Sequence, residues 1–366
     1  MDSFINGLIA LAVFIPVITV IVSIHEFGHY AVAKLCKVKI DAFSIGFGRE
    51  IFGWNDKSGT RWKFCWLPLG GYVKMFGDVN PASAPDPKMQ NLSEEEKKLT
   101  FHFKKLPQKA AIVAAGPVAN FILTIAIITF FYSYYGKAIY QTQIGEVVAE
   151  SAAAEAGLKE GDIILSLDGK KMNTFSDIAR EISLNVGTPV EIKLLREKKE
   201  MTITATPKFT EIQDALGNTV QVGRLGIVTT EGEFEQLSLP KALVAASLET
   251  YYMGTSTLKA MGQMITGKRG LEGLGGPLRI AKYSGQASKQ GFRTVLWLIA
   301  LISVNLGLIN LFPIPVLDGG HLLYYVIEVL QGKPLADKYQ EYGFRVGLIL
   351  IIALAIFATI NDFRFL

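Results

Sequence analysis

The chain has 366 residues, of which half are apolar and only 19% are charged, and its formal net charge is +4. A soluble protein of this length usually carries more charge, so the composition favours an integral membrane protein. The small net charge gives no support for nucleic-acid binding. The two cysteines, Cys36 and Cys65, are too few for a disulfide framework and too widely spaced for a thiolate zinc site.

The first apolar segment, residues 1–36, ends in a metal-binding pattern. Phe4 to Ile24 contains no charged residue, and on a helix this run is about 30 Å long, enough to cross a bilayer. The sequence His25-Glu26-Phe27-Gly28-His29 follows it. On a helix the two histidines share one face and can bind one zinc ion, which leaves Glu26 beside the metal as a general base. An ordinary polar helix end is the alternative, but ionised groups within a membrane are costly.

Residues 37–108 form the loop between the first two predicted spans. Residues 34–109 contain fourteen Lys or Arg and eight Asp or Glu, so the positive-inside rule places this loop in the cytoplasm. An apolar stretch around Gly70-Gly71-Tyr72-Val73 predicts a β-strand with a turn at the glycines. We expect this β region to lie against the membrane near the active site.

Three further apolar segments complete a polytopic α-helical membrane protein with four transmembrane helices. The second helix is predicted within 109–136 and the third within 291–318. Residues 319–366 are expected to form a loop and the fourth helix. With the first loop in the cytoplasm, both termini and residues 137–290 lie on the opposite side.

Residues 137–230 have the pattern of a soluble α+β domain. The motif A-G-L-x-x-G-D-x-I-x-x-x-D-G, from Ala156 to Gly169, closely resembles a bacterial PDZ domain. Such domains bind peptide C-termini by strand addition, and the resemblance would place the ligand loop at Ile144-Gly145. A purely steric element is the alternative. Residues 231–290 predict an amphipathic connector helix that lies on the membrane or simply links two domains.

The third metal ligand is predicted in the segment from Asn305 to His321, which reads NLGLINLFPIPVLDGGH. Asp318 follows the third membrane helix, whose end reaches the depth of the two histidines. Pro313 and Pro315 break the helix, which a membrane tolerates only inside protein or beside a water cavity. An aspartate here completes a His₂Asp zinc site with an open fourth position.

These motifs together resemble the site-2 protease family, most closely the bacterial regulator-of-sigma-E protease type (RseP type). The resemblance rests on H-E-F-G-H, G-G-Y-V-K-M, Ala115-Gly116-Pro117-x-x-Asn120-Phe121, the PDZ pattern and N-x-x-P-x-P-x-L-D-G-G-H, and it covers essentially the whole chain. It implies that His25, His29 and Asp318 bind zinc and that Glu26 is the catalytic base. It also implies that Asn305 and Asn310 hold an unwound substrate. The single PDZ domain departs from the enterobacterial type, which has two.

The expected activity is therefore zinc-dependent cleavage within the membrane of single-pass substrates. The resemblance implies an anti-sigma factor trimmed by a first protease, or remnant signal peptides, as substrates. The expected partners are these substrates and the lipid bilayer. No nucleic-acid partner is expected. We place the protein in a bacterial inner membrane, with the PDZ domain periplasmic and the active site near the cytoplasmic side. An inactive membrane-anchored PDZ adaptor is one alternative, and a metal transporter is another, although the latter needs more membrane-embedded ligands.

Overall fold

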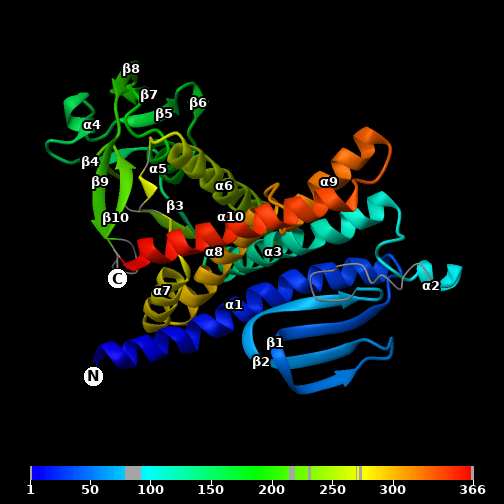
Figure 1. Ribbon diagram of the computed structural model, residues 1–366. Helices are drawn as coiled ribbons and strands as arrows, with labels where there is room; N and C mark the ends of the chain where they lie inside the picture. Colours follow the sequence, from blue (N-terminus) through cyan, green and yellow to red (C-terminus); the bar gives the residue numbers. More distant parts are fainter. Residues whose placement is uncertain are drawn as a thin grey trace. The chain divides into compact units, whose positions relative to one another are not determined.

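The computed structural model describes residues 2–78, 92–213, 219–229, 232–268, 270–271 and 274–363. The chain divides into two compact units. The first combines Met1–Ile127 with Leu274–Leu366, and the second is Ile128–Gly273. The first unit carries the long apolar helices, and the second carries most of the polar domain predicted from the sequence (Figure 1).

Seven helices are described in or leading out of the first unit. They are α1 (Asp2–Leu35), α2 (Glu94–Lys97), α3 (Leu106–Tyr134), α7 (Pro277–Lys289), α8 (Phe292–Asn310), α9 (Asp318–Gln331) and α10 (Asp337–Phe363). Among the described residues, α1, α3, α8 and α10 are long and apolar enough to cross a membrane. These four helices correspond to the four segments expected from apolar run length.

Helix α9 corrects the expectation of a loop directly after Asp318. Leu322 and Tyr325, three residues apart, lie on one face of α9 and pack against a core cluster that includes Phe43, Val73 and Ile112. The sequence prediction for residues 319–366 does not distinguish the apolar residues of α9 from those of the membrane helix that follows. Burial of one face against the first unit stabilises it as a helix.

Strands β1 (Ile40–Asn55) and β2 (Arg61–Met75) form a long antiparallel hairpin beside α1 (Figure 1). Residues 42–45 of β1 pair with 71–74 on one side and with 61–64 on the other, so the hairpin folds back on itself. The predicted turn at Gly70-Gly71 is therefore wrong, because both glycines lie inside β2. Gly70 has φ +123°, a conformation that glycine adopts without a steric penalty, and it lies where the hairpin bends.

The second unit contains an α+β domain and one long helix. Its elements are β3 (Lys137–Ile139), β4 (Ile144–Val147), α4 (Ala152–Glu155), β5 (Ile163–Leu167), β6 (Lys170–Lys171), α5 (Phe175–Ser183), β7 (Val190–Arg196), β8 (Lys199–Ala205), β9 (Lys208–Gln213), β10 (Thr219–Arg224), β11 (Ile227–Thr229), β12 (Glu233–Glu235) and α6 (Leu239–Ile265). The order β6-β5-β7-β8 gives an antiparallel sheet. Ile164, Ile178 and Ile192 belong to its fully buried core.

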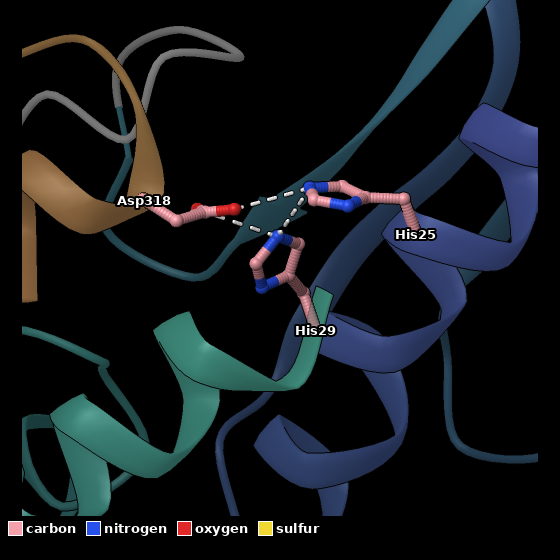
Figure 2. Close-up of side chains that lie close together, drawn as sticks. All are labelled: His25, His29 and Asp318. Atoms are coloured by element: carbon pink, nitrogen blue, oxygen red, sulfur yellow. Dashed lines mark hydrogen bonds and ion pairs between the residues drawn. The ribbon is translucent and has the colours of Figure 1, made fainter. Parts of the chain in front are cut away.

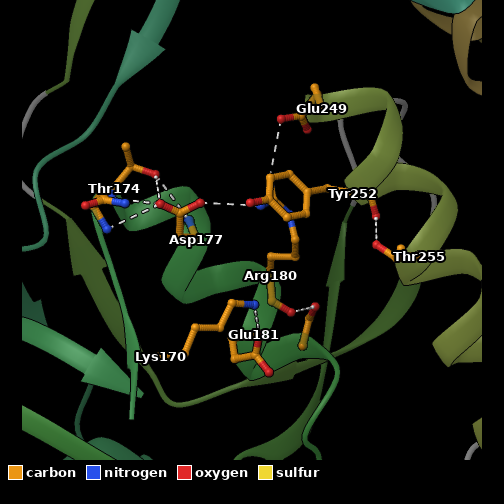
Figure 3. Close-up of polar contacts among 10 residues, drawn as sticks. Lys170, Thr174, Asp177, Arg180, Glu181, Glu249, Tyr252 and Thr255 are labelled. Carbon is orange, nitrogen blue, oxygen red and sulfur yellow. Dashed lines mark hydrogen bonds and ion pairs between the residues drawn. The ribbon is translucent and has the colours of Figure 1, made fainter. Parts of the chain in front are cut away.

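Helix α6 packs on this domain through α5. The Arg180 side chain donates to the Glu249 carboxylate at 3.4 Å and lies over the Tyr252 ring at 4.2 Å (Figure 3). The connector predicted over 231–290 therefore contains a helix, α6, but the range also includes a second one: α6 lies in the second unit and α7 in the first. The glycine-rich stretch 267–276, followed by Pro277, separates the two helices, because these residues disfavour a continuous helix.

Candidate metal centre

The histidine pair of α1 lies on one face of the helix, as the i, i+4 spacing predicts. The Nε2 atoms of His25 and His29 are 3.2 Å apart. Both point toward the start of α9 (Figure 2). Their side chains are only 8% and 13% exposed, so the pair is largely withdrawn from the surface of the protein.

Asp318 is presented by a sharp reversal between two helices. Helix α8 ends at Asn310 and α9 begins at Asp318 itself, with the two prolines in the non-helical connection. Val316 has φ +100°, which is a strained conformation for a β-branched residue. A Cβ added at Gly319 would overlap the carbonyls of Leu311 and Phe312, so only glycine fits this tight start. The strained connection therefore fixes where the aspartate lies.

The three side chains converge on one point. Asp318 Oδ2 lies 3.1 Å from His25 Nε2, and Oδ1 lies 3.5 Å from His29 Nε2 (Figure 2). Four ligands placed tetrahedrally about 2.0 Å from a zinc ion are separated by roughly 3.3 Å. Asp318 Oδ2 is also buried without a hydrogen-bond donor. Spacing, donor type and the unsatisfied oxygen all fit a zinc ion held by these residues.

A backbone carbonyl orients the His29 ring. Its Nδ1 lies 2.8 Å from the carbonyl oxygen of Ile112 in α3. Because a carbonyl can only accept, Nδ1 carries the proton and Nε2 keeps its lone pair for a metal. The side-chain amide of Asn120, also in α3, lies next to Nδ1 of His25.

Two glycines let α1 and α3 approach closely at this point. A Cβ added at Gly28 would overlap the carbonyl group of Ala115, and one added at Gly116 would overlap the imidazoles of His25 and His29. Gly116 and Asn120 were noticed in the sequence only as part of a family motif. Their positions depend on how two helices distant in sequence pack, which the spacing of residues within one helix cannot predict.

Glu26 lies between the histidines and strand β2. Its carboxylate interacts with the backbone amide of Val73. A Cβ added at Gly71 would be in van der Waals contact with Glu26 Cγ, at 3.6 Å. The same atom would overlap the Ser44 carbonyl oxygen, at 2.5 Å. Strand β2 and helix α1 are thus in direct contact at Glu26, as expected for the predicted β region.

A cavity of about 550 Å³ opens beside the metal centre. Among the predicted site residues, it is lined by His25, Glu26, His29, Val73, Asn310 and Asp318. The other candidates are not among its lining residues: Gly70, Gly71 and Tyr72 lie in β2, and Pro313 and Pro315 lie in the connection before Asp318. Asn305 lies further back on α8, where its Nδ2 donates to the Leu301 carbonyl. The cavity is large enough for a short extended peptide segment.

The PDZ ligand loop predicted at Ile144-Gly145 does not offer a free strand edge at its first residue. The Ile144 N–H donates to the Asp162 carbonyl, and the Ile144 carbonyl accepts from Gly161 N–H. On its other edge β4 pairs with β11, and Ile144 itself is fully buried. The backbone groups of Ile144 are thus already paired, and the ligand loop at Ile144-Gly145 stays a prediction. Spacing within the motif did not reveal which neighbouring segments pair with β4.

The site combines two histidines one helical turn apart, an aspartate from a second helix and an adjacent glutamate, and it lies among long apolar helices. This combination defines a metalloprotease of the membrane. A sequence profile of Peptidase family M50, the site-2 protease family, matches residues 13–354. The chain belongs to this family.

Full-length relatives carry names of the same class. Atu1380 of Agrobacterium fabrum, a zinc metalloprotease by assignment, is 44% identical over 354 residues, covering 95% of this chain and 94% of its own length. The metalloprotease MmpA of Caulobacter vibrioides is 37% identical over 382 residues, covering 98% and 96%. A solved PDZ domain of the SdrC-like protein Lmo2051 from Listeria monocytogenes is 22% identical, covers 25% of this chain and 85% of its own, and has a TM-score of 0.19.

Proposed function

We propose that the protein is a zinc-dependent intramembrane endopeptidase that cuts single-pass membrane proteins. The observation that carries this proposal is the convergence of Asp318 on the histidine pair. Three ligand groups from two separate helices converge, with one ligand atom from each lying within 4.8 Å of the others, beside a cavity lined by the adjacent glutamate. The setting among helices apolar enough to cross a membrane supports a reaction within the bilayer.

In this proposal His25, His29 and Asp318 hold the metal. A bound zinc ion polarises the scissile carbonyl and lowers the pKa of water. Glu26 accepts a proton from the water whose oxygen attacks the carbonyl carbon, and it passes this proton to the leaving nitrogen, so that the C–N bond breaks to give a new carboxyl group and a new amine. Burial of the ligands excludes bulk water from all but the open position.

A transmembrane substrate must lose its helical hydrogen bonds before its peptide bond can be cut. The backbone of β2 from Gly70 to Val73, close to Glu26, can pair with an extended segment of substrate. Asn310 lines the same cavity, and its amide can bond to backbone groups released by unwinding. Asn305, Pro313 and Pro315 complete the proposed substrate region: the prolines keep the connection non-helical.

The proposed substrates are anti-sigma factors already trimmed by a first protease, and remnant signal peptides. We place the metal centre near the cytoplasmic side of a bacterial inner membrane and the domain at residues 137–230 in the periplasm. We assign this domain as a PDZ domain that screens substrates by the bulk of their outer part. The excess of basic residues over 34–109 supports this orientation.

The direct test compares membrane proteomes of cells that carry the wild-type protein or the Glu26→Gln form. We expect single-pass stubs to accumulate only with Glu26→Gln, because glutamine keeps the size of glutamate but cannot accept a proton. A catalytically inactive adaptor predicts identical proteomes for the two strains. Zinc analysis of the same purified proteins then shows whether unchanged proteomes result from the absence of metal or from the absence of a substrate.

A further inference from the structure

Asn120 is held rigidly between α3 and α8, in the part of the first unit next to the metal centre. Its backbone carbonyl accepts hydrogen bonds from Ser303 Oγ at 2.9 Å and Thr124 Oγ1 at 3.1 Å. The Thr124 hydroxyl also lies 3.0 Å from the Ala300 carbonyl. Gly307 of α8 fits against this region with no room to spare, since a Cβ there would be 3.2 Å from Asn120 Cβ. The position of the Asn120 side chain is therefore fixed by packing.

The side-chain amide of Asn120 lies against the imidazole of His25. Its Nδ2 is 3.3 Å from Nδ1 of His25, and its Oδ1 is buried without a hydrogen-bond donor. The residue is completely buried, so that oxygen is shielded from bulk water. The two ends of an amide have nearly the same shape, and a half-turn about the last side-chain bond exchanges them without any other movement.

The metal centre requires a particular tautomer of His25. For Nε2 to offer a lone pair to a cation, the ring proton must be on Nδ1, and a buried N–H needs an acceptor. His29 has the Ile112 carbonyl in this role. For His25 the amide of Asn120 lies within hydrogen-bonding distance of Nδ1, and Oδ1 turned toward the ring would satisfy both groups at once.

We propose that Asn120 is a positioning residue of the metal centre, whose Oδ1 accepts the Nδ1–H of His25. This inference rests on the proposed zinc site at His25, His29 and Asp318. A neutral amide orients the ring without adding another negative charge beside Asp318 and Glu26. The seam of hydroxyls from Thr124 and Ser303 holds the backbone that carries this amide, so α8 acts on the metal ligand through α3.

The test measures zinc affinity of the purified full-length protein by competition with a chelator. Asn120→Leu keeps the approximate volume but removes the acceptor, and we expect zinc affinity to fall about 10–100-fold. Asn120→Asp retains an acceptor and should bind zinc at least as tightly as wild type. Thr129→Val is the matched control: it removes a hydroxyl from the same helix that makes no hydrogen bond in the described part of the chain, and it leaves the acceptor in place, so its zinc affinity should equal that of wild type.

Cobalt substitution adds a readout that a purely structural role would not change. The visible absorption of Co²⁺ reports the geometry and basicity of its ligands, so it should shift in Asn120→Leu and Asn120→Asp but not in Thr129→Val. If Asn120→Leu does not fold, Asn120→Ala replaces it, and the required order of affinity is aspartate and asparagine above alanine. Wild-type zinc affinity and cobalt spectrum in a folded variant without the acceptor would overturn the inference.

A further variant separates this inference from the proposed function. His25→Ala should lose zinc whatever the role of Asn120. If His25→Ala retains the zinc affinity of wild type, the proposed metal site is wrong. If His25→Ala loses zinc and Asn120→Leu does not, only the role of Asn120 is wrong.

Discussion

Gly116 in α3 lies directly against the imidazole of His25 in α1: a Cβ added to this glycine would be 2.7 Å from Nε2 of His25. The same added atom would also overlap Nε2 of His29. Helix α3 thus closes one side of the metal centre with backbone alone, while Asp318 approaches from α9 (Figure 2). The two imidazoles therefore fit at this site because Gly116 has no side chain.

We first predict that Gly116→Ala lowers zinc affinity by about ten-fold or more. Metal sites tolerate errors of only about 0.2 Å in ligand position, and the new methyl group needs the space of the two imidazoles. The measurement is chelator competition on the purified protein. Gly7→Ala is the control, because a Cβ at Gly7 would have nothing within 4 Å. Equal zinc affinity in both variants would contradict the close approach of α3.

The second prediction separates the metal ligands from the base. His29→Ala and Asp318→Asn each remove or weaken one of three protein ligands, so the purified proteins should contain much less than one zinc per chain. Glu26→Gln should keep full zinc content and lose proteolysis, because it changes only the proposed proton acceptor. Zinc is measured by elemental analysis and cleavage by release of a fragment from a reconstituted single-pass substrate. A Glu26→Gln protein that still cleaves would rule out the proposed mechanism.

The local part of the metal centre could be predicted from the sequence. Residues four apart on a helix share a face, so His25 and His29 had to be neighbours once α1 was recognised as a helix. The position of Asp318 followed from counting membrane crossings, since the end of the third span returns to the depth of the histidines. Both inferences use only helix periodicity and bilayer thickness.

Features that depend on tertiary packing could not be predicted in this way. The contacts of Gly116 and Asn120 with the histidines arise where α1 and α3 cross, and no periodicity encodes that crossing. The hairpin bend at Gly70 was mistaken for a turn, because glycine allows both. The ligand loop is predicted at Ile144-Gly145, and the sequence does not reveal that β4 pairs with β11 and with the segment before β5. These features all concern which segments pair.

A third prediction concerns the stability of the domain in the second unit. The Asp162 carboxylate is 1% exposed and receives two hydrogen bonds from Arg196, each 2.7 Å long. Burial acts to raise the pKa of Asp162, but the bonds from Arg196 and from the Lys159 N–H outweigh it, so this pKa lies below its usual value. The ionised form is favoured by folding. The stabilisation is therefore complete above the ordinary aspartate pKa, about 3.9, and is lost as the pH falls through the lower folded pKa.

Asp162→Asn should accordingly destabilise the domain by about 2 kcal/mol at pH 7, because it removes the charge from two hydrogen bonds between the buried Asp162 and Arg196, whose side chain is 20% exposed. The measurement is hydrogen exchange of β5 and β7 in the full-length protein. Glu200→Gln is the matched control: Glu200 pairs with Lys193, but both side chains are about half exposed, so the loss should be below about 1 kcal/mol. Equal loss of protection in the two variants would refute the special role of the Asp162 pair.

The fourth prediction tests the orientation in the membrane. Cys36 and Cys65 are replaced by serine, and single cysteines are then introduced at Ser58, in the turn between β1 and β2, and at Lys170, in β6. Both positions are exposed. An impermeant thiol reagent should label the Lys170→Cys protein in intact spheroplasts and the Ser58→Cys protein only after lysis. Labelling of both in intact spheroplasts would overturn the cytoplasmic placement of the metal centre.

The last prediction concerns the domain inserted between the membrane helices. Strands β3 and β12 pair with each other, with Glu233 opposite Ile139. Deletion of residues 140–228 therefore removes the domain between two segments that already lie side by side. None of the proposed metal ligands is within the deleted range. We expect the shortened protein to fold in the membrane and to retain zinc.

The cleavage pattern of this deletion decides between two roles for the domain. If the domain screens substrates by their outer bulk, the deletion should leave cleavage of a trimmed substrate nearly unchanged and should permit cleavage of the untrimmed one. If it captures a new C-terminus, cleavage of the trimmed substrate should slow and the untrimmed one should stay resistant. We expect the first result, because the strand edges at Ile144 are already paired and offer no groove there. The same deletion combined with Glu26→Gln is the control for contaminating proteases. A deletion protein that retains zinc, cuts the trimmed substrate and still rejects the untrimmed one would show that size exclusion is performed elsewhere in the chain.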